Sequence, residues 1–157
     1  MTKPSIEERV ASSELFAGLP PDVVRALAEH ATVRRAAEGE VIFHYGDPAN
    51  TFYLVLGGRV SVEVAAIEGP ALVLQQPSPG AVLGWSWLIA PHVWSFQARA
   101  ETDAELIEFD GVALRARCEQ SPEFGYPLLK RISALMSERL LAARRKMMDA
   151  WRPAGFA

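Results

Sequence analysis

The segment between residues 79 and 100 carries turns and side chains suited to binding a small anion. Pro79-Gly80 and Gly84 allow sharp backbone turns, and a short helix is expected to begin near Trp85. Amides at the start of such a helix can hold an anion, and the hydroxyl of Ser95 can donate to a phosphate oxygen. No side-chain cation stands beside Ser95 in the sequence. The segment therefore predicts a small-ligand pocket that lacks a charged partner for the ligand.

Arg99 is the next cation along the chain, and strand alternation decides where it points. The odd-numbered residues from 95 to 99 fall on one face of the expected strand, and the even-numbered residues from 96 to 100 fall on the other. The even-numbered set is apolar and is expected to face the core. Arg99 is therefore expected to reach solvent, and it is assigned, with His92, to the edge of the pocket.

The sequence offers little for catalysis or metal binding. Its three histidines are scattered, without the His-x-His or His-Glu-x-x-His spacing that gives a metal two ligands on one face. Arg115 and Arg117 precede Cys118 and would lower its pKa, but a lone Cys on an amphipathic helix is expected to pack rather than react. We therefore expect no catalytic residue, no metal, no cofactor and no enzyme.

Composition indicates one compact domain. The chain has 157 residues, 50% of them hydrophobic and 22% charged, which is enough to bury one sizeable core. A net charge of -3 gives no general attraction to nucleic acid or to an anionic membrane. No secretion signal or membrane-spanning run is found, and a single Cys is compatible with a reducing compartment. A cytoplasmic protein without a membrane partner is expected.

Two stretches carry a family resemblance. The first reads Leu83-Gly84-Trp85-Ser86-Trp87-Leu88 and, five residues later, Trp94-Ser95-Phe96-Gln97-Ala98-Arg99-Ala100. The second, residues 39–58, has a Gly-Glu turn, an apolar strand, a Gly-Asp, an apolar run and a closing glycine. Both resemble the cyclic-nucleotide-binding domain family, and the first resembles its phosphate-binding cassette. The likeness covers roughly residues 14 to 150.

The resemblance implies which side chains would hold a nucleotide. A glutamate after Gly84 would hold the ribose 2'-hydroxyl, and an arginine before Ser95 would pair with the cyclic phosphate; Trp85 and Trp94 stand at these positions. Losing the arginine typically costs about 2–5 kcal/mol and losing the hydroxyl contact about 1–3 kcal/mol. Usual binding of cyclic AMP or cyclic GMP is therefore not expected. The candidate ligand contacts of the cassette are Gly84, Trp85, Ser86, Trp87, Leu88, Trp94, Ser95 and Phe96.

The elements that position the cassette can be read from periodicity. A helix is expected at residues 6–12, with Ser5 as its cap and Glu8 completing a capping box. A second helix begins at Pro20-Pro21 and ends near His30. Its buried face is expected to hold Val23, Leu27 and Ala31.

Between residues 32 and 110 the period changes to two. Three valines at residues 60–64 alternate with Arg59, Ser61 and Glu63, which predicts a half-buried strand. Gly57-Gly58 is expected to join it to a strand at 51–56 as a two-residue hairpin. Further strands are expected at 41–44, 72–76, 95–100 and 105–109. This pattern, with the resemblance, predicts an α+β, mainly β fold: a β jelly roll flanked by N-terminal helices and a long C-terminal helix.

Helical spacing returns after residue 110. A short helix is expected at 111–119, and Ser121-Pro122-Glu123 begins a long helix that reaches about Trp151. An apolar stripe along it consists of Leu129, Ile132, Met136, Leu140, Ala143 and Met147. One barrel covers only part of this helix, so we expect a homodimer through the stripe, as related domains often form. The alternative is that the stripe folds back on its own barrel.

DNA binding is not expected. Transcription regulators with this sensory domain carry a helix-turn-helix domain after the long helix, whereas this sequence ends six residues past Trp151. The basic run Arg144-Arg145-Lys146 is explained by the helix dipole. A single domain over 1–157 without a helix-turn-helix is expected, with helices in 1–31, a jelly roll in 32–110 and helices in 111–151.

The function expected is that of a non-enzymatic sensor or interaction module. In relatives of the family, ligand at the cassette repositions the C-terminal helix, so an occupant near Trp85 and Trp94 would alter a partner surface here. Indoles suit a planar or apolar ligand, and the partner, a small molecule or a protein, is not identified. Two alternatives stay open. One is a genuine cyclic-nucleotide sensor with a rewired pocket, and the other is a structural interaction domain whose pocket the tryptophans fill.

Overall fold

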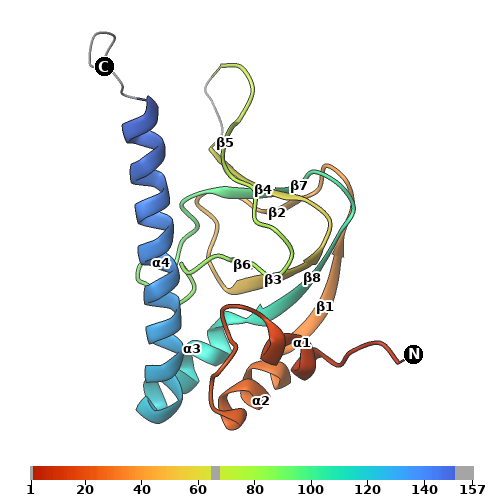
Figure 1. The fold of residues 1–157 in the computed structure, drawn as a ribbon, viewed down its shortest axis with the longest axis vertical. Coiled ribbons are helices and arrows are strands. Elements are labelled where there is room, and N and C mark those ends of the chain that lie inside the picture. The colour runs from red at the N-terminus through yellow and green to blue at the C-terminus, as the bar shows by residue number, and fades with distance from the viewer. Residues whose placement is uncertain (1, 65–67, 151–157) are drawn as a thin grey trace.

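The protein is a β jelly roll with helices at both ends (Figure 1). The computed structural model describes residues 2–64 and 68–150. Within these residues two four-stranded antiparallel sheets have the strand orders β1-β8-β3-β6 and β2-β7-β4-β5. The strands are β1 Ala31–Ala36, β2 Val41–Phe43, β3 Thr51–Gly57, β4 Val60–Val64, β5 Leu72–Gln75, β6 Val82–Leu83, β7 Gln97–Ala100 and β8 Ala104–Asp110. The α+β, mainly β fold class is confirmed.

Two short helices, α1 Ile6–Ser12 and α2 Pro21–Glu29, precede the barrel. The predicted capping box is present: Glu8 N–H donates to Ser5 Oγ, and Ser5 N–H donates to the Glu8 carboxylate. Pro21 opens α2, and His30 is its C-cap, as expected. Ala31 does not extend the buried face of α2; it begins β1, because the chain there pairs with Phe109 of β8.

Strands β3 and β8, in the middle of the first sheet, are buried on both faces, whereas most of the edge strand β1 is exposed or half-buried. The outward face of this sheet, together with the helices, forms one apolar core that includes Phe52, Ile107 and Phe109. The inward face of the sheet and the second sheet enclose the jelly-roll interior, which includes Tyr53 and Leu106. Strands β3 and β8 therefore separate two hydrophobic cores, and a change in one core can reach the other through them.

Strand β4 is not half-buried as predicted. Ser61 is 1% exposed and Glu63 is 5% exposed, although both alternate with the inward-facing valines. The Glu63 carboxylate accepts hydrogen bonds from Ser61 Oγ at 3.3 Å and Gln97 Nε2 at 2.5 Å, and pairs with Arg99 at 3.1 Å. The alternation pattern assumed that polar residues face water, whereas here neighbouring polar side chains cover them.

The predicted hairpin at Gly57-Gly58 is also wrong. Strands β3 and β4 belong to different sheets, so this glycine pair carries the chain from one sheet to the other. Gly58 has a φ of 84°, and a Cβ placed on it would lie 2.3 Å from the carbonyl oxygen of Asp103. Glycine is required here because the backbone of the β7–β8 turn approaches closely.

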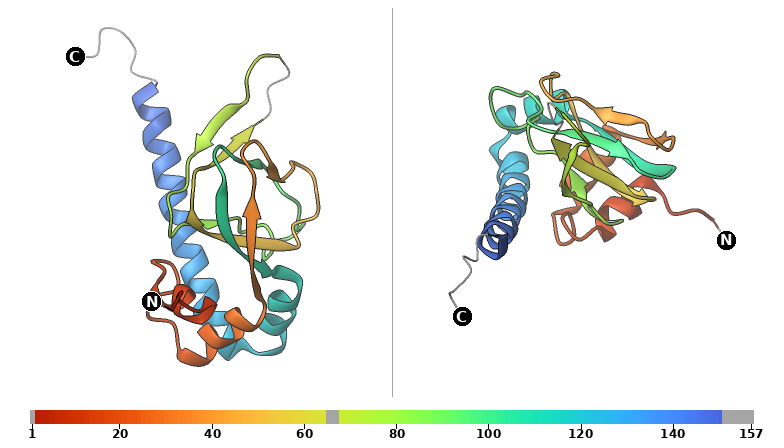
Figure 2. Two further views of the ribbon diagram at one scale, coloured as in Figure 1. Left: turned by 90° about the vertical axis from the view of Figure 1, so that its right-hand side faces the viewer. Right: turned by 90° about the horizontal axis from the view of Figure 1, so that it is seen from above.

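The chain ends in two helices, α3 Gly111–Gln120 and α4 Pro122–Ala150. Pro122 stands in the first turn of α4 as predicted, and the backbone carbonyl of Ser121 caps it by accepting from the N–H groups of Phe124 and Gly125. Trp151, the expected end, lies outside the described residues. The helix runs along one side of the barrel and continues past it (Figures 1 and 2). No helix in residues 2–64 and 68–150 is long and apolar enough to cross a membrane.

Candidate functional site

The cassette begins at β6 and continues as a turn. Gly84 follows Leu83 with a φ of 88°, and residues 86–88 form a turn in which Leu88 N–H donates to Trp85 C=O at 3.0 Å. The short helix expected near Trp85 is absent from this described segment, which makes one closed turn and then bends. The helix N-terminus that was expected to hold an anion is therefore not formed here.

Trp94 occupies the jelly-roll interior. Its side chain is 4% exposed and stacks on Phe43, with ring centroids 3.8 Å apart and planes at 12°. A Cβ on Gly84 would lie 2.5 Å from two carbons of the Trp94 ring. The Trp94 backbone is fixed as well, since its N–H donates to Asp47 and its carbonyl accepts from Gly46. The indole therefore lies directly against the glycine at the start of the cassette.

Trp87 lies in the other core, toward the helices. It is fully buried and stacks on Phe52, with ring centroids 4.5 Å apart, and Phe52 stacks in turn on Phe109. Arg115 Nη1 donates to its backbone carbonyl at 2.6 Å. Its indole Nε1 has no hydrogen-bond partner among the described residues. Trp87 and Trp94 consequently do not share one cavity.

Trp85 faces helix α4. It is partly exposed, and the guanidinium of Arg139 lies over its ring, 5.2 Å from the centroid. Arg139 Nη2 also donates to the backbone carbonyl of Val82, and burial lowers the pKa of Arg139. Sequence reasoning missed Arg139. The available signal was its spacing, because it lies seven residues after the buried Ile132 and so shares its helix face.

The other predicted cassette residues lie around these tryptophans at varied depth. Ser86 and Leu88 are half-buried, Ser95 is exposed, and Phe96 packs partly against the barrel core. Strand β7 begins at Gln97 rather than at Ser95, because the chain bends at residues 95–96 before it pairs with β4. The exposed hydroxyl of Ser95 is thus separated from the buried ring of Trp94.

The two pocket-edge candidates lie in different surroundings. The inward direction predicted for the even-numbered residues of β7 is confirmed at Ala98 and Ala100, which are fully buried. Arg99 is on the opposite face with a side chain 43% exposed, and its partner is Glu63, which the sequence did not suggest. The backbone carbonyl of His92 accepts from Ala49 N–H at 2.8 Å, which places His92 beside the loop before β3.

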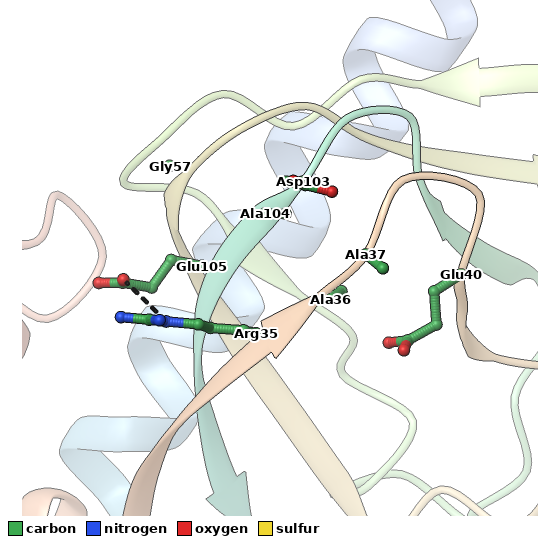
Figure 3. Close-up of a pocket in the computed structure, with 8 residues that line it drawn as sticks. All are labelled: Arg35, Ala36, Ala37, Glu40, Gly57, Asp103, Ala104 and Glu105. Atoms are coloured by element: carbon green, nitrogen blue, oxygen red, sulfur yellow. Dashed lines mark ion pairs between the residues drawn. The ribbon is translucent and has the colours of Figure 1, made fainter.

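Two surface hollows are formed by other parts of the fold. One, of about 540 Å³, lies along β1 and β8, with the carboxylate of Glu105 facing Arg35 at 3.8 Å and Glu40 on the other side (Figure 3). Its lining is Arg35, Ala36, Ala37, Glu40, Gly57, Asp103, Ala104 and Glu105. The second, of about 490 Å³, is lined by residues of 29–32, 50–51 and 108–112. Neither lining includes a cassette residue.

Within residues 2–64 and 68–150, no group of three His, Cys, Asp or Glu side chains is arranged to hold a metal ion. Burial, and to a lesser degree Glu119, raises the pKa of Cys118. The lowering expected from Arg115 and Arg117 does not occur, because Arg115 reaches the Trp87 carbonyl and Arg117 lies over Phe124.

The apolar stripe of α4 divides into two parts. Ile132 is buried in the core of its own chain, and Met136 packs partly against that core. The remaining members, Leu129, Leu140, Ala143 and Met147, are exposed. The alternative that the helix folds back on its own barrel thus describes its first half, and every residue from Leu140 to Ala150 is exposed.

Comparisons with known proteins agree on one family. The family model described as "Cyclic nucleotide-binding domain" matches residues 33–121. A CRP-like cAMP-activated global transcriptional regulator of Mycobacterium tuberculosis is 23% identical over 144 residues, which are 92% of this chain and 62% of that protein. Acetyltransferase Pat of Mycolicibacterium smegmatis is 39% identical over 75 residues, 48% of this chain and 22% of that protein. The chain thus spans less than two thirds of the length of either relative.

Two solved structures give the same result for the fold. A protein of Geobacter metallireducens described as cyclic nucleotide-binding superposes with a TM-score of 0.77 at 26% identity, over 89% of this chain and 99% of that one. A c-di-GMP-responsive global regulator of Xanthomonas campestris superposes with a TM-score of 0.70 at 27% identity, over 85% of this chain and 66% of that one.

Proposed function

The chain belongs to the cyclic nucleotide-binding domain family, and from this premise we propose that it is a non-enzymatic regulatory module whose ligand site is degenerate. In this proposal it does not bind cyclic AMP or cyclic GMP in the usual way, and it signals through α4 to a partner. The observation that carries the proposal is the place of Trp94, whose ring lies inside the barrel against Gly84.

Energetics support the loss of nucleotide binding. A buried arginine that pairs with a phosphate contributes about 2–5 kcal/mol, and a carboxylate that holds a hydroxyl contributes about 1–3 kcal/mol. Their sum corresponds to several powers of ten in the dissociation constant. The side chains at these two positions are indoles, which supply neither charge nor a carboxylate. A nucleotide would also have to displace the Trp94 ring from its stack on Phe43.

The contact of Arg139 with Trp85 supports signalling through α4. Trp85 stands at one of the two positions that the family uses for ligand contact, and here it meets a side chain of the helix directly. A guanidinium over an indole is worth roughly 0.5–2 kcal/mol, more where water is excluded. Any change at the turn of residues 84–88 would therefore alter how the middle of α4 is held.

Exposed apolar side chains on α4 support a homodimer. Leu140 and Met147 are each 71% exposed, lie seven residues apart and share one helix face with Leu129. An isologous contact of two α4 helices along this face would bury all three. The first half of α4 stays on its own barrel through Phe124, Leu128 and Ile132. In this proposal the chain is a single domain, and no direct DNA contact is part of its function.

The names of the relatives indicate what such a module can regulate. They include a transcriptional regulator, an acetyltransferase, a glutaminase and a potassium channel, and the chain covers 62%, 22%, 20% and 30% of these proteins. In our proposal, this module uses the surface of its α4 helix to regulate a separate protein, as a domain can regulate the rest of a longer chain. Two alternatives remain: a purely structural domain with a filled pocket, which the packing of Trp94 favours, and a cyclic-nucleotide sensor with a rewired pocket.

Hydrogen exchange tests the coupling. In the Trp85→Ala variant, backbone amides of residues 136–150 should exchange about three- to thirtyfold faster, because the loss of the Arg139 contact lowers the free energy of local opening. Amides of β1 and β8 should be unchanged. The matched control is Tyr126→Ala, which removes an exposed aromatic ring that lies under Lys130 of the same helix. Unchanged exchange in Trp85→Ala would contradict signalling from the cassette to α4.

A further inference from the structure

Arg139 is a partly buried cation without an acidic partner. It projects from α4 toward the barrel, and no carboxylate of residues 2–64 or 68–150 lies within 4.0 Å of it. Its contacts are the carbonyl of Val82 and the face of Trp85, which offer only partial negative charge. Charges removed from water are normally paired with an opposite charge. Glu138, the preceding residue, acts on Arg139 electrostatically but makes no ion pair with it among the described residues. Arg139 therefore has no anion in direct contact.

The position of Arg139 suits a ligand that enters at the cassette. It stands where β6 passes into the turn that begins at Gly84, on the side of the barrel that α4 covers. Lys146 lies seven residues further along the same face of the helix, about 10 Å away at 1.5 Å per residue, and donates to the carbonyl of Leu74. This side of α4 thus presents two cations to the barrel, and both donate to backbone carbonyls.

We propose that Arg139 is the anion contact of this protein, and that it takes the phosphate group of a small molecule that binds between α4 and the cassette. The proposal rests on the function proposed above and names the chemistry of the occupant that would act on α4. The planar guanidinium can donate two parallel hydrogen bonds to a phosphate. Binding would draw Arg139 from Trp85 and Val82, so the ligand and the helix–cassette contact compete for one side chain.

Pyrophosphate is a suitable probe because it carries the anion without a sugar or base. Its binding can be followed from the indole N–H signal of Trp85 in nitrogen-15 correlation spectra, with Trp85→Phe used for assignment. Titrations are run at constant ionic strength with sodium chloride as the reference salt, which removes general screening effects. Adenosine is titrated in parallel as a ligand without phosphate.

The expected result is a saturable shift of the Trp85 signal with pyrophosphate and none with adenosine. Arg139→Gln should weaken pyrophosphate binding by about tenfold or more, because it removes the charge that strengthens the hydrogen bonds to the anion. Arg139→Lys keeps the charge and should recover part of the affinity. Arg144→Gln removes an exposed arginine of the same helix and should change affinity less than about twofold, by analogy with other rim charges.

Three results would overturn this proposal: no saturable shift in the wild-type protein, equal affinity in Arg139→Gln, or an adenosine shift that Arg139→Gln does not alter. Thermal unfolding of each variant shows that it is folded. A negative result would leave the proposed function standing, because the hydrogen-exchange comparison of Trp85→Ala uses no ligand. Conversely, pyrophosphate binding with unchanged exchange in Trp85→Ala would retain the anion site and remove the coupling.

Discussion

Replacing Trp94 with alanine should lower the free energy of unfolding by about 3–5 kcal/mol, the range for large aromatic residues in well-packed cores. The ring is 4% exposed, stacks on Phe43 and touches the backbone of Gly84, so its removal leaves a cavity that these neighbours cannot close. Urea unfolding of the two proteins measures the difference directly.

Two further measurements make this prediction specific. Trp85→Ala is the matched control, and it should cost less, about 1–2 kcal/mol, because Trp85 is partly exposed and packs only against the outside of the helix-side core, under Arg139. Indole added to Trp94→Ala should raise its melting temperature, since an apolar cavity of this kind binds a ligand of matching shape. Equal costs for the two variants would show that Trp94 does not fill the barrel interior.

Introducing glutamate at Leu140 and Met147 together should convert a dimer to a monomer. These side chains are each 71% exposed and lie one heptad apart, so two glutamates per chain would place four buried charges in the proposed helix contact. Sedimentation equilibrium of the wild-type and variant proteins should show half the mass for the variant over the same concentration range.

The helix supplies its own control for this experiment. Leu141 and Met148 are 47% and 60% exposed and also lie seven residues apart. On the helix, however, they point about 100° away from Leu140 and Met147. Glutamates at Leu141 and Met148 should leave the dimer intact. A monomeric wild-type protein, or dissociation by both pairs of substitutions alike, would contradict the proposed contact.

Local signals predicted the helices at the two ends of the chain well, but they also predicted a short helix near Trp85 that is a turn, and they predicted the sheet pairing less well. The capping box at Ser5 and the proline at the start of α4 depend on neighbouring residues, and both are present. The partner of a strand depends on residues far along the chain. Gly57-Gly58 therefore predicted a hairpin, although its two strands belong to different sheets. Glu63 was assigned to solvent for the same reason, since Arg99 and Gln97 lie over thirty residues away.

In the candidate site, too, the sequence pointed to individual residues but not to their contacts with distant parts of the chain. The family pattern singled out Trp85 and Trp94. In the structure these two side chains lie apart: Trp94 packs in the jelly-roll interior, whereas Trp85, like Trp87, packs against the helix-side core. Arg139 could be anticipated from its spacing to Ile132, but its contact with Trp85 depends on where α4 docks. Neither propensity nor motif encodes that docking.

The most direct test of the degenerate site is thermal unfolding of the wild-type protein with cyclic AMP and with cyclic GMP, each near millimolar concentration. A ligand at 100 times its dissociation constant adds about 2.7 kcal/mol, or roughly 5–10 °C for a domain of this size. We predict no shift in melting temperature with either nucleotide. A shift of several degrees would mean that the pocket opens and binds cyclic nucleotide through other contacts, and it would contradict the central claim that Trp85 and Trp94 have closed this site to its usual ligand.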